Sequence, residues 1–231
     1  MTAQDVYLTD TLKSANVLYK KPTLADAPKT GLYRNFFKRA LDITLIILSA
    51  PVIMPIIATL ALIVALNGGK PFYAQDRIGK NGRVFRMWKL RSMVCDADDE
   101  LKSCLSANTE MRDEWDSKQI LLNDPRVTPV GHVLRKSSID ELPQLFNVLK
   151  GDMSLVGPRP MMVDQRAMYP GDDYYDLRPG ITGFWQITDR NNASFAERAF
   201  HDGRYNARLS LLTDIKVLWA TIRVVLRGTG C

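Results

Sequence analysis

An uncharged apolar run near the N-terminus constrains this chain more than any other feature. Residues 43–66 form a stretch of 24 positions without an Asp, Glu, Lys or Arg. A straight helix of that length would measure ~36 Å, which is enough to cross the ~30 Å hydrocarbon layer of a bilayer. We therefore expect a membrane helix, and the 231 residues leave room for one medium-sized domain beside it.

Two prolines in the middle of this run argue against a plain span. Pro51 and Pro55 each remove a backbone donor and bend a helix. Pro55 divides the run into arms of about 12 residues, each ~18 Å long, which is roughly half a bilayer. Basic residues also flank both ends, whereas a spanning helix usually carries them on one side. Two interpretations stay open. One is a kinked span, in which neighbouring groups form the backbone hydrogen bonds that the prolines remove. The other is a re-entrant hairpin with both ends in the cytoplasm.

Positive charge is concentrated directly after the apolar run. Residues 70–91 contain seven basic side chains against Asp76 alone, so their net charge of +6 equals that of the whole chain. A basic block beside a membrane segment suits anionic lipid headgroups or phosphate ligands. Nucleic acid is the rival interpretation of a pI near 9.2. The position of the block next to the apolar run disfavours that rival.

Cysteines and histidines give no sign of a metal site. Cys95, Cys104 and Cys231 show no paired spacing, and with the two histidines they match no zinc pattern. Scattered cysteines fit a domain that faces the reducing cytoplasm. Residues 1–37 are mixed and polar, which predicts a loose N-terminal tail without the apolar core of a signal peptide.

Local patterns predict short elements after the membrane segment. Residues 72–93 predict a β-hairpin, because the turn Gly79-Lys80-Asn81-Gly82 contains Asn-Gly, a strong hairpin signal. Residues 95–118 predict a polar helix, and residues 140–150 predict a short helix closed by Gly151. Pro179-Gly180 predicts a turn.

The C-terminal residues 205–227 predict an amphipathic helix. Its apolar face is expected to consist of Ile215, Leu218, Trp219, Ile222, Val225 and Leu226. Lys216, Arg223 and Arg227 are expected on the opposite face. The pattern fits a helix that lies in the membrane interface with Trp219 at headgroup level. Packing against the core of the domain explains it equally well.

Asp140 and Glu141 are the strongest candidates for chemistry. Pro143 can occupy only the first turn of its helix, so Asp140 is expected at or next to the N-cap. Capping alone explains an aspartate there. The same position would also seat a phosphate and keep Asp140 ionised as a nucleophile. Glu141 could hold a divalent cation that offsets the repulsion between carboxylate and phosphate.

Basic residues around this pair are candidates for binding substrate. Arg135 precedes Asp140 by five positions, and a guanidinium binds phosphate oxygens in a fork. In Gly157-Pro158-Arg159-Pro160 two prolines fix the backbone around Arg159, which makes a rigid turn that presents one guanidinium. Lys89 and Arg91 are further phosphate-binding candidates. Arg178, Arg190 and Asn191 are candidates for contacting a nucleotide, although ordinary loop chemistry also explains them.

Seven motifs follow one another along the chain. They are Lys38-Arg39 with Asp42, the proline-broken run, Arg77-Ile78-Gly79, Lys89-Leu90-Arg91-Ser92-Met93, Asp140-Glu141-Leu142-Pro143-Gln144, Gly157-Pro158-Arg159-Pro160 and Arg178-Pro179-Gly180-Ile181-Thr182-Gly183. This ordered set resembles the bacterial sugar transferase family, the monotopic polyprenyl-phosphate phosphoglycosyltransferases. The similarity is greatest to single-domain members that start exopolysaccharide synthesis with galactose-1-phosphate.

The resemblance implies an α+β fold in three parts. Residues 1–37 would be a tail, residues 38–69 a re-entrant membrane hairpin broken at Pro51 and Pro55, and residues 70–231 a mostly helical cytoplasmic catalytic domain. That domain would contain the small β-hairpin and interfacial amphipathic helices. Two departures stand out: Met54 replaces the serine usual before the breaking proline, and Asp189-Arg190-Asn191 replaces the common Gly-Arg-Asn.

The resemblance also implies a reaction at the bacterial inner membrane. A sugar-1-phosphate would pass from a UDP-sugar, UDP-galactose or UDP-glucose, to undecaprenyl phosphate with release of UMP, as the first membrane step of exopolysaccharide synthesis. Asp140 would form a covalent aspartyl-phosphosugar intermediate, Glu141 would bind Mg²⁺, and Arg135 and Arg159 would bind phosphate. The partners would be the donor, the lipid acceptor and membrane lipids, with a homo-oligomer among the options and no nucleic acid.

Two other functions stay open. A membrane-anchored adaptor without chemistry explains the basic block and the apolar run, but not the acidic pair or the ordered arginines. A phosphatase acting on polyprenyl diphosphate would use similar residues. Nucleotide-dependent release of a monophosphate would separate that phosphatase from a transferase.

Overall fold

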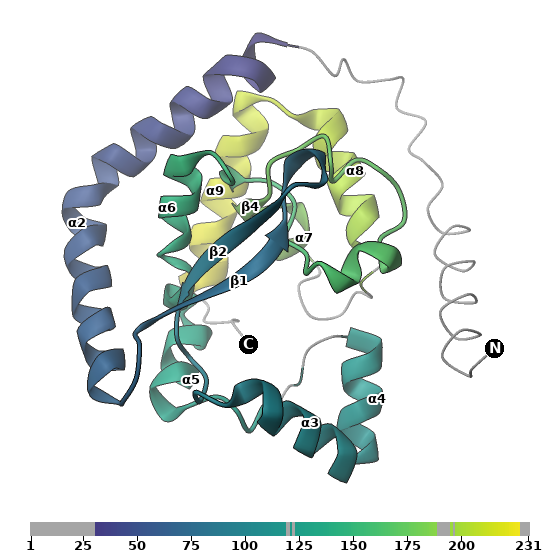
Figure 1. Ribbon diagram of the computed structural model, residues 1–231. Coiled ribbons are helices and arrows are strands. Elements are labelled where there is room, and N and C mark those ends of the chain that lie inside the picture. Colours follow the sequence, from purple (N-terminus) through teal and green to yellow (C-terminus); the bar gives the residue numbers. More distant parts are fainter. Residues whose placement is uncertain (1–30, 119–120, 122, 189–194, 196, 227–231) are drawn as a thin grey trace.

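A long apolar helix, α2 (Lys38–Leu66), follows one side of a small mixed domain in the computed structural model (Figure 1). Within the described residues helices predominate, and strands form two two-stranded sheets. The expected mixture of helix and sheet, mostly helical and with a small antiparallel sheet, is therefore confirmed. The structure describes residues 31–118, 121, 123–188, 195 and 197–226.

The apolar run forms one continuous helix and is not divided into two separate arms. A short π-helical turn, η1 (Tyr33–Phe37), leads into α2, which passes through both Pro51 and Pro55. Figure 1 shows α2 bent near its middle, and the two prolines lie in the middle of its sequence. A bend is expected where proline rings remove backbone donors. The re-entrant hairpin stays a prediction.

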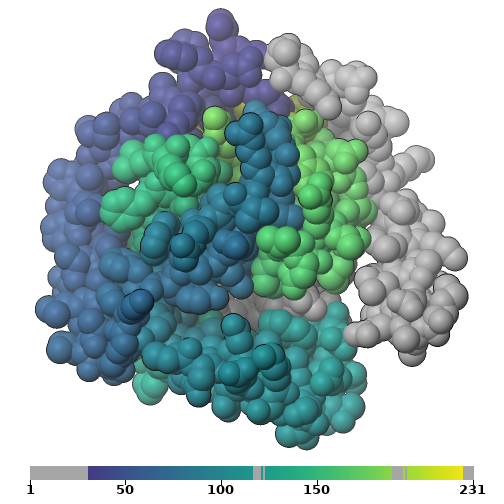
Figure 2. Space-filling view, viewed as in Figure 1, coloured from purple at the N-terminus to yellow at the C-terminus, as the bar shows by residue number. Residues whose placement is uncertain are grey.

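The outer surface of α2 is apolar and uncovered. The helical stretch Tyr33–Leu66 is long and apolar enough to cross a membrane, and only 17% of its most apolar window is buried. Figure 2 shows α2, in purple to blue, along the rim of the molecule. The exposed side chains include Ile47, Leu48, Val52, Leu62 and Leu66. An apolar surface of this extent indicates association with a membrane.

The expected β-hairpin is confirmed. β1 (Phe72–Ile78) pairs antiparallel with β2 (Val84–Leu90). The connecting turn, η2 (Lys80–Gly82), contains Asn81 at φ 59°, a left-handed conformation that asparagine tolerates. Because alternate residues of a strand share a face, Lys89 lies on the same face of β2 as the buried Met87. Arg77 pairs across the hairpin with the buried Phe85, so it lies on that inner face as well.

The polar helix expected over residues 95–118 is two helices. α3 (Ala97–Ala107) and α4 (Thr109–Lys118) are separated at Asn108, whose backbone is extended. The Asn108 carboxamide oxygen accepts a hydrogen bond of 3.1 Å from the Met111 backbone N–H. Asn108 therefore caps the second helix, which explains the break.

The segment around the acidic pair also differs from the expected single helix. α5 (Pro129–Lys136) is followed by Ser138 in a left-handed conformation at φ 56°. A 3-10 turn, η3 (Ile139–Glu141), comes next, and α6 (Gln144–Lys150) begins only after Pro143. The expected end at Gly151 is confirmed, because its φ is 97°.

A second, parallel pair of strands replaces the turn expected at Pro179-Gly180. β3 (Ser154–Val156) pairs with β4 (Gly180–Thr182). A Cβ on Gly180 would lie 2.1 Å from the backbone nitrogen of Gly157. Gly180 is therefore needed for close approach of two backbones, which the sequence pattern does not distinguish from a turn.

Four further helices complete the described fold, and the last two form its C-terminal region. They are η4 (Asp164–Met168), α7 (Phe184–Ile187), α8 (Arg198–Arg208) and α9 (Leu211–Leu226). The buried Val217 and the half-buried Leu218 of α9 pack against Leu177 and Tyr205. The exposed side of α9 carries Leu212, Ile215, Trp219 and Ile222. The core-packing interpretation is therefore confirmed for one side of α9, and the location of its exposed apolar side in the membrane interface stays a prediction.

The placement expected for the basic residues of α9 is wrong. Lys216 and Arg223 are exposed, but each follows an exposed apolar residue, Ile215 or Ile222, by one position. They therefore flank the exposed apolar stripe, because the opposite side of the helix packs against the domain. Arg227 lies outside the described residues.

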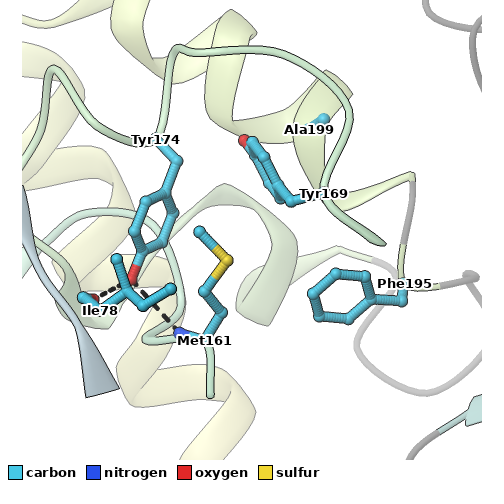
Figure 3. Packing of buried hydrophobic residues seen from close by; sticks show 6 residues of the cluster. All are labelled: Ile78, Met161, Tyr169, Tyr174, Phe195 and Ala199. Atoms are coloured by element: carbon cyan, nitrogen blue, oxygen red, sulfur yellow. Dashed lines mark hydrogen bonds between the residues drawn. The ribbon is translucent and has the colours of Figure 1, made fainter. Parts of the chain in front are cut away.

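A buried aromatic cluster fixes the end of β1 against the segment after β3. Figure 3 shows Tyr174 pointing between Ile78 and Met161. The Tyr174 hydroxyl donates a hydrogen bond to the Ile78 carbonyl and accepts one of 3.2 Å from the Met161 N–H. Phe195 and Ala199 extend the cluster towards α8. The cluster thus holds Arg77, next to Ile78, close to the segment that contains Arg159.

Buried polar contacts attach the start of α2 to the domain. The Lys38 ammonium donates hydrogen bonds of 2.7 Å to the Asp214 carboxylate on α9 and 2.9 Å to the Val156 carbonyl on β3. One turn later, the Asp42 carboxylate accepts from the Ser154 hydroxyl at 2.8 Å and the Leu155 N–H at 3.1 Å. These contacts therefore attach α2 directly to the strand that leads into Gly157-Pro158-Arg159-Pro160.

Candidate active site

A small cleft lies where the inner face of the hairpin meets η3 and the two parallel strands. Its open volume, including solvent at its mouth, is about 270 Å³. Side chains from six parts of the fold line it, among them Arg77, Lys89, Glu141, Gln144, Arg159 and Ile181. These residues are far apart in the sequence, so the cleft is assembled only by the folded domain.

Asp140 and Glu141 share a single lysine. The Lys89 ammonium lies 2.9 Å from a Glu141 carboxylate oxygen and 3.8 Å from an Asp140 carboxylate oxygen. Asp140 is only 5% exposed. A carboxylate this buried needs compensating charge, and Lys89 supplies it. The structure therefore brings the acidic pair and the phosphate-binding candidate Lys89 together.

The left-handed Ser138 places Arg135 and Asp140 at one site. Arg135 belongs to the last turn of α5, and the chain reverses at Ser138 before Asp140 follows in η3. The Arg135 guanidinium donates a hydrogen bond of 2.9 Å to the Ser92 hydroxyl. Its charge acts on Asp140, as does that of Arg159. A non-glycine residue in a left-handed conformation is uncommon, and such residues cluster at functional sites.

Asp140 does not cap a helix in this structure. The N-cap of η3 is Ser138 and that of α6 is Pro143, and neither provides a side-chain cap. Burial raises the pKa of the Asp140 carboxyl above its ordinary value, and Glu141 raises it further, while the positive charges of Lys89, Arg135 and Arg159 oppose this rise. Asp140 lies in the first turn of η3, and the expectation that a helix N-terminus keeps it ionised stays a prediction. Nearby cations also oppose the rise of its pKa.

Several predicted site residues lie elsewhere. β2 ends at Leu90, so Arg91 leaves the strand and its guanidinium binds the Gly68 carbonyl beyond the end of α2. The Arg178 guanidinium donates a hydrogen bond of 3.0 Å to the Gly151 carbonyl at the end of α6. Neither contact belongs to the cleft. Arg190 and Asn191 lie outside the described residues.

Three residues near the cleft have no role in the sequence-based prediction. Arg77 lines the cleft, and the guanidiniums of Arg159 and Arg198 lie 5.7 Å and 4.4 Å from the centre of the Trp185 ring. Arg77 was visible in the Arg77-Ile78-Gly79 motif, but nothing distinguished it within a block of seven basic residues. No local sequence signal joins Trp185 to Arg198, because only the fold brings α7 and α8 together.

The acidic pair fits a magnesium ion that is shared with substrate. Among the residues that the structure describes, no three or more His, Cys, Asp and Glu side chains group into a metal site. Magnesium is usually held by one or two carboxylates together with substrate phosphates and water. Glu141 supplies a carboxylate at the cleft, where it contacts Lys89. These donors fit an ion bound jointly by Glu141 and a phosphate.

Comparison with known proteins identifies the family of this chain. Residues 33–228 match the family described as Bacterial sugar transferase. The exopolysaccharide production protein ExoY of Sinorhizobium fredii is 40% identical over 208 residues, which cover 87% of this chain and 92% of ExoY.

Two longer relatives carry more specific names. An undecaprenyl-phosphate galactose phosphotransferase of Salmonella typhimurium is 44% identical over 198 residues, and a UDP-galactose-lipid carrier transferase of Erwinia amylovora is 43% identical over 198 residues. Each match covers 85% of this chain but only 42% of the relative, so the chain spans less than half of their length. The family model matches most of this chain, and ExoY matches it nearly end to end. The resemblance inferred from the ordered motifs is thus confirmed, and the chain belongs to the bacterial sugar transferase family.

Proposed function

We propose that this chain transfers a sugar-1-phosphate from a nucleoside-diphosphate sugar to undecaprenyl phosphate at a membrane. The observation that carries this proposal is the buried Asp140 carboxylate, flanked by Lys89 at 3.8 Å and by the charges of Arg135 and Arg159. A carboxylate nucleophile surrounded by fixed cations is suited to attack a phosphate, because the cations neutralise the charge that develops. The names of the Salmonella and Erwinia relatives support UDP-galactose as the donor.

The reaction would proceed in two displacements at one phosphorus. An Asp140 carboxylate oxygen attacks the phosphorus that bears the sugar, the anhydride P–O bond breaks, and its electron pair leaves on the nucleoside monophosphate. A phosphate oxygen of the lipid then attacks the same phosphorus, and the bond to Asp140 breaks to restore the carboxylate. Neither step requires a proton, because both leaving groups are weak bases.

The protein side chains would divide the remaining work. Lys89, Arg135 and Arg159 would bind phosphate oxygens and hold the donor in line with Asp140. A magnesium ion bound through Glu141 would supply further neutralisation of phosphate charge. The half-buried position of Glu141 beside Lys89 supports that role, since a cation at Glu141 would release Lys89 towards phosphate.

The exposed apolar surfaces of α2 and α9 would hold the site at the membrane, where the lipid acceptor is located. α2 carries an uncovered apolar side, and α9 carries an exposed stripe that includes Trp219. Trp is favoured at headgroup level, so α9 would lie in the interface while α2 enters the bilayer. We place the domain on the cytoplasmic side of the inner membrane, where the nucleotide donor is available.

Two alternatives explain less of the structure. A non-catalytic adaptor has no use for a carboxylate that is 5% exposed and surrounded by cations. A polyprenyl-diphosphate phosphatase would use the same cations. It would act without a nucleotide donor and would release inorganic phosphate.

Purified protein, undecaprenyl phosphate and a panel of nucleoside-diphosphate sugars test the proposal directly. We expect release of a nucleoside monophosphate with one donor class and formation of a lipid-linked sugar diphosphate. Release of inorganic phosphate from polyprenyl diphosphate, without any nucleotide, would establish the phosphatase instead. Absence of both activities in a folded protein would favour the adaptor.

The bent α2 predicts that both of its ends lie on the cytoplasmic side. Phe36→Cys and Lys70→Cys, each made without the native cysteines, should react with an impermeant thiol reagent only in inside-out vesicles. Cys95 is exposed in the catalytic domain, so a variant that keeps it alone provides the cytoplasmic reference. Labelling of either position from the outside contradicts the re-entrant arrangement. Replacing Pro51 and Pro55 together should shift the helix towards a straight span.

Glu141→Gln should lower turnover by at least ~10-fold and weaken the dependence on magnesium, because an amide is a poorer ligand for a hard cation. Turnover measured across a magnesium titration tests this expectation. Glu110→Gln, at an exposed position on α4, serves as the matched control. Full activity of the wild-type protein in excess chelator rules out the metal role.

A further inference from the structure

Three guanidiniums stand together beside the cleft: that of the buried Arg198 and those of the half-buried Arg77 and Arg159. Within the described residues, neither Arg77 nor Arg159 nor Arg198 forms an ion pair. Arg159 and Arg198 share the Trp185 ring, and Arg77 lines the cleft with Arg159. Concentrating positive charge in a buried place is unfavourable unless an anion neutralises it.

The buried polar atoms of this cluster point to the same conclusion. In the part of the chain that the structure describes, Nε of Arg77, Nε of Arg198 and Nε1 of Trp185 are buried without a hydrogen-bond partner. The other Arg77 nitrogens are used, because one donates to the Pro160 carbonyl at 3.3 Å and the other to the Gln75 carboxamide at 2.6 Å. Buried donors without acceptors are rare in folded proteins and call for a specific explanation.

The acid–base state of these arginines agrees with an anion site. Burial and, to a smaller extent, the charge of Arg159 lower the pKa of Arg77 to about 10. Burial and Arg159 likewise lower the pKa of Arg198 to about 9. Asp202 lies near Arg198, but its carboxylate accepts a hydrogen bond of 2.8 Å from the Tyr169 hydroxyl, and burial raises the pKa of Asp202 to about 7. The charge of Asp202 opposes the lowering of the Arg198 pKa but does not reverse it.

We propose that Arg77 and Arg159, with Arg198 behind them, form the seat for the phosphate that leaves as nucleoside monophosphate. Lys89 and Arg135 then hold the neighbouring phosphate, which Asp140 attacks. This inference rests on the proposed function. In-line displacement requires the leaving oxygen to lie opposite the attacking carboxylate. The acceptor oxygen must approach from that same side, so the lipid phosphate uses the same seat after the nucleotide has left.

Equilibrium binding of uridine monophosphate tests the seat without any turnover. Arg77→Met should weaken the binding of uridine monophosphate by about 10-fold to 100-fold, because a charge-assisted contact to phosphate is lost. Binding of uridine, which lacks the phosphate, should change little. Arg86→Met is the matched control, since Arg86 lies on the exposed face of the same hairpin. Arg198→Met should also weaken the binding of uridine monophosphate. Its control is Arg204→Met on the same helix, because Arg204 lies against another aromatic ring, 5.4 Å from the centre of Phe200.

A second measurement covers variants that fail to fold. In the wild-type protein, uridine monophosphate should slow the modification of Arg77 by an arginine-specific reagent more than it slows that of Arg86. Unchanged nucleotide affinity in folded Arg77→Met, equal losses for uridine and its monophosphate, or absence of protection at Arg77 overturns the proposal. A loss confined to a short prenyl phosphate also overturns it, because the site would then serve the acceptor alone.

Failure of this proposal is distinguishable from failure of the proposed function. If the wild-type protein releases no nucleoside monophosphate from any donor, the proposed function fails and the seat fails with it. If release occurs normally and Arg77→Met binds uridine monophosphate like the wild type, only the assignment of the seat is wrong.

Discussion

Asp140→Asn should fold normally and lose nearly all turnover, by at least ~10³-fold. A neutral amide cannot replace the carboxylate as a nucleophile towards phosphorus. The substitution preserves the size of the side chain. It also removes a buried carboxylate, whose pKa is raised because burial disfavours its charged form. We therefore expect no loss of stability. Turnover with donor and undecaprenyl phosphate, together with a thermal melt of each protein, provides the measurement.

The covalent mechanism makes a sharper prediction for the same residue. Wild-type protein given the donor without lipid should release about one nucleoside monophosphate per active site, then stop, and the peptide with Asp140 should gain the mass of a sugar phosphate. Asp164→Asn, at an exposed position in η4, is the control. It should release the nucleoside monophosphate and gain the sugar phosphate as the wild type does. An active Asp140→Asn variant, or a donor half-reaction that requires lipid, would falsify the covalent mechanism.

The raised pKa of Asp140 also sets the direction of the pH dependence. In the proposed mechanism only the ionised carboxylate attacks. Burial keeps the protonated form present at higher pH than for an ordinary aspartate. On acidification, kcat/KM for the donor should therefore fall before the usual aspartate range is reached, because this ratio reports the free enzyme. A profile that stays flat down to about pH 4 contradicts this placement of the nucleophile.

Local signals in the sequence were sufficient where a residue type fixes a local conformation. The Asn81-Gly82 turn predicted the hairpin, and Gly151 predicted the end of α6. β3 and β4 were missed because each has only three residues, and Gly180 serves close backbone approach as readily as a turn. Such short strands form only when other parts of the chain supply their partners.

The absence of a local signal for contacts between distant parts of the chain also explains which site residues were predictable. Arg135 and Asp140 are five residues apart, and Arg159 sits in a proline-fixed turn, so their chemistry is visible locally. Arg91 was misplaced because the end of β2 at Leu90 decides where its side chain goes. Arg198 reaches Trp185 only through the packing of α8 on α7, for which the sequence carries no local signal.

Lys38→Met should lower the stability of the domain by about 3–5 kcal/mol, because it leaves the Asp214 carboxylate buried without its cation. Asp214 is 1% exposed and would retain only the hydroxyls of Tyr33 and Tyr205, at 2.6 Å and 2.7 Å. Methionine preserves the apolar stem of the lysine, so the charge is the main change. For a chain of this size the expected loss corresponds to a decrease in Tm of roughly 6–20 °C, measured by thermal unfolding in a fixed detergent.

The neighbouring residue provides a matched control for this prediction. Arg39→Met removes a cation that donates to the Val148 and Leu149 carbonyls at an exposed edge, so it should lower Tm by only a few degrees. Adding Asp214→Asn to Lys38→Met should recover part of the loss, since the uncompensated charge is removed. The Lys38 ammonium also binds the Val156 carbonyl, one residue before Gly157-Pro158-Arg159-Pro160. Lys38→Met should therefore also lower turnover at temperatures below the melting range. Equal melting of Lys38→Met and Arg39→Met would show that the buried ion pair does not fasten the membrane helix to the catalytic domain.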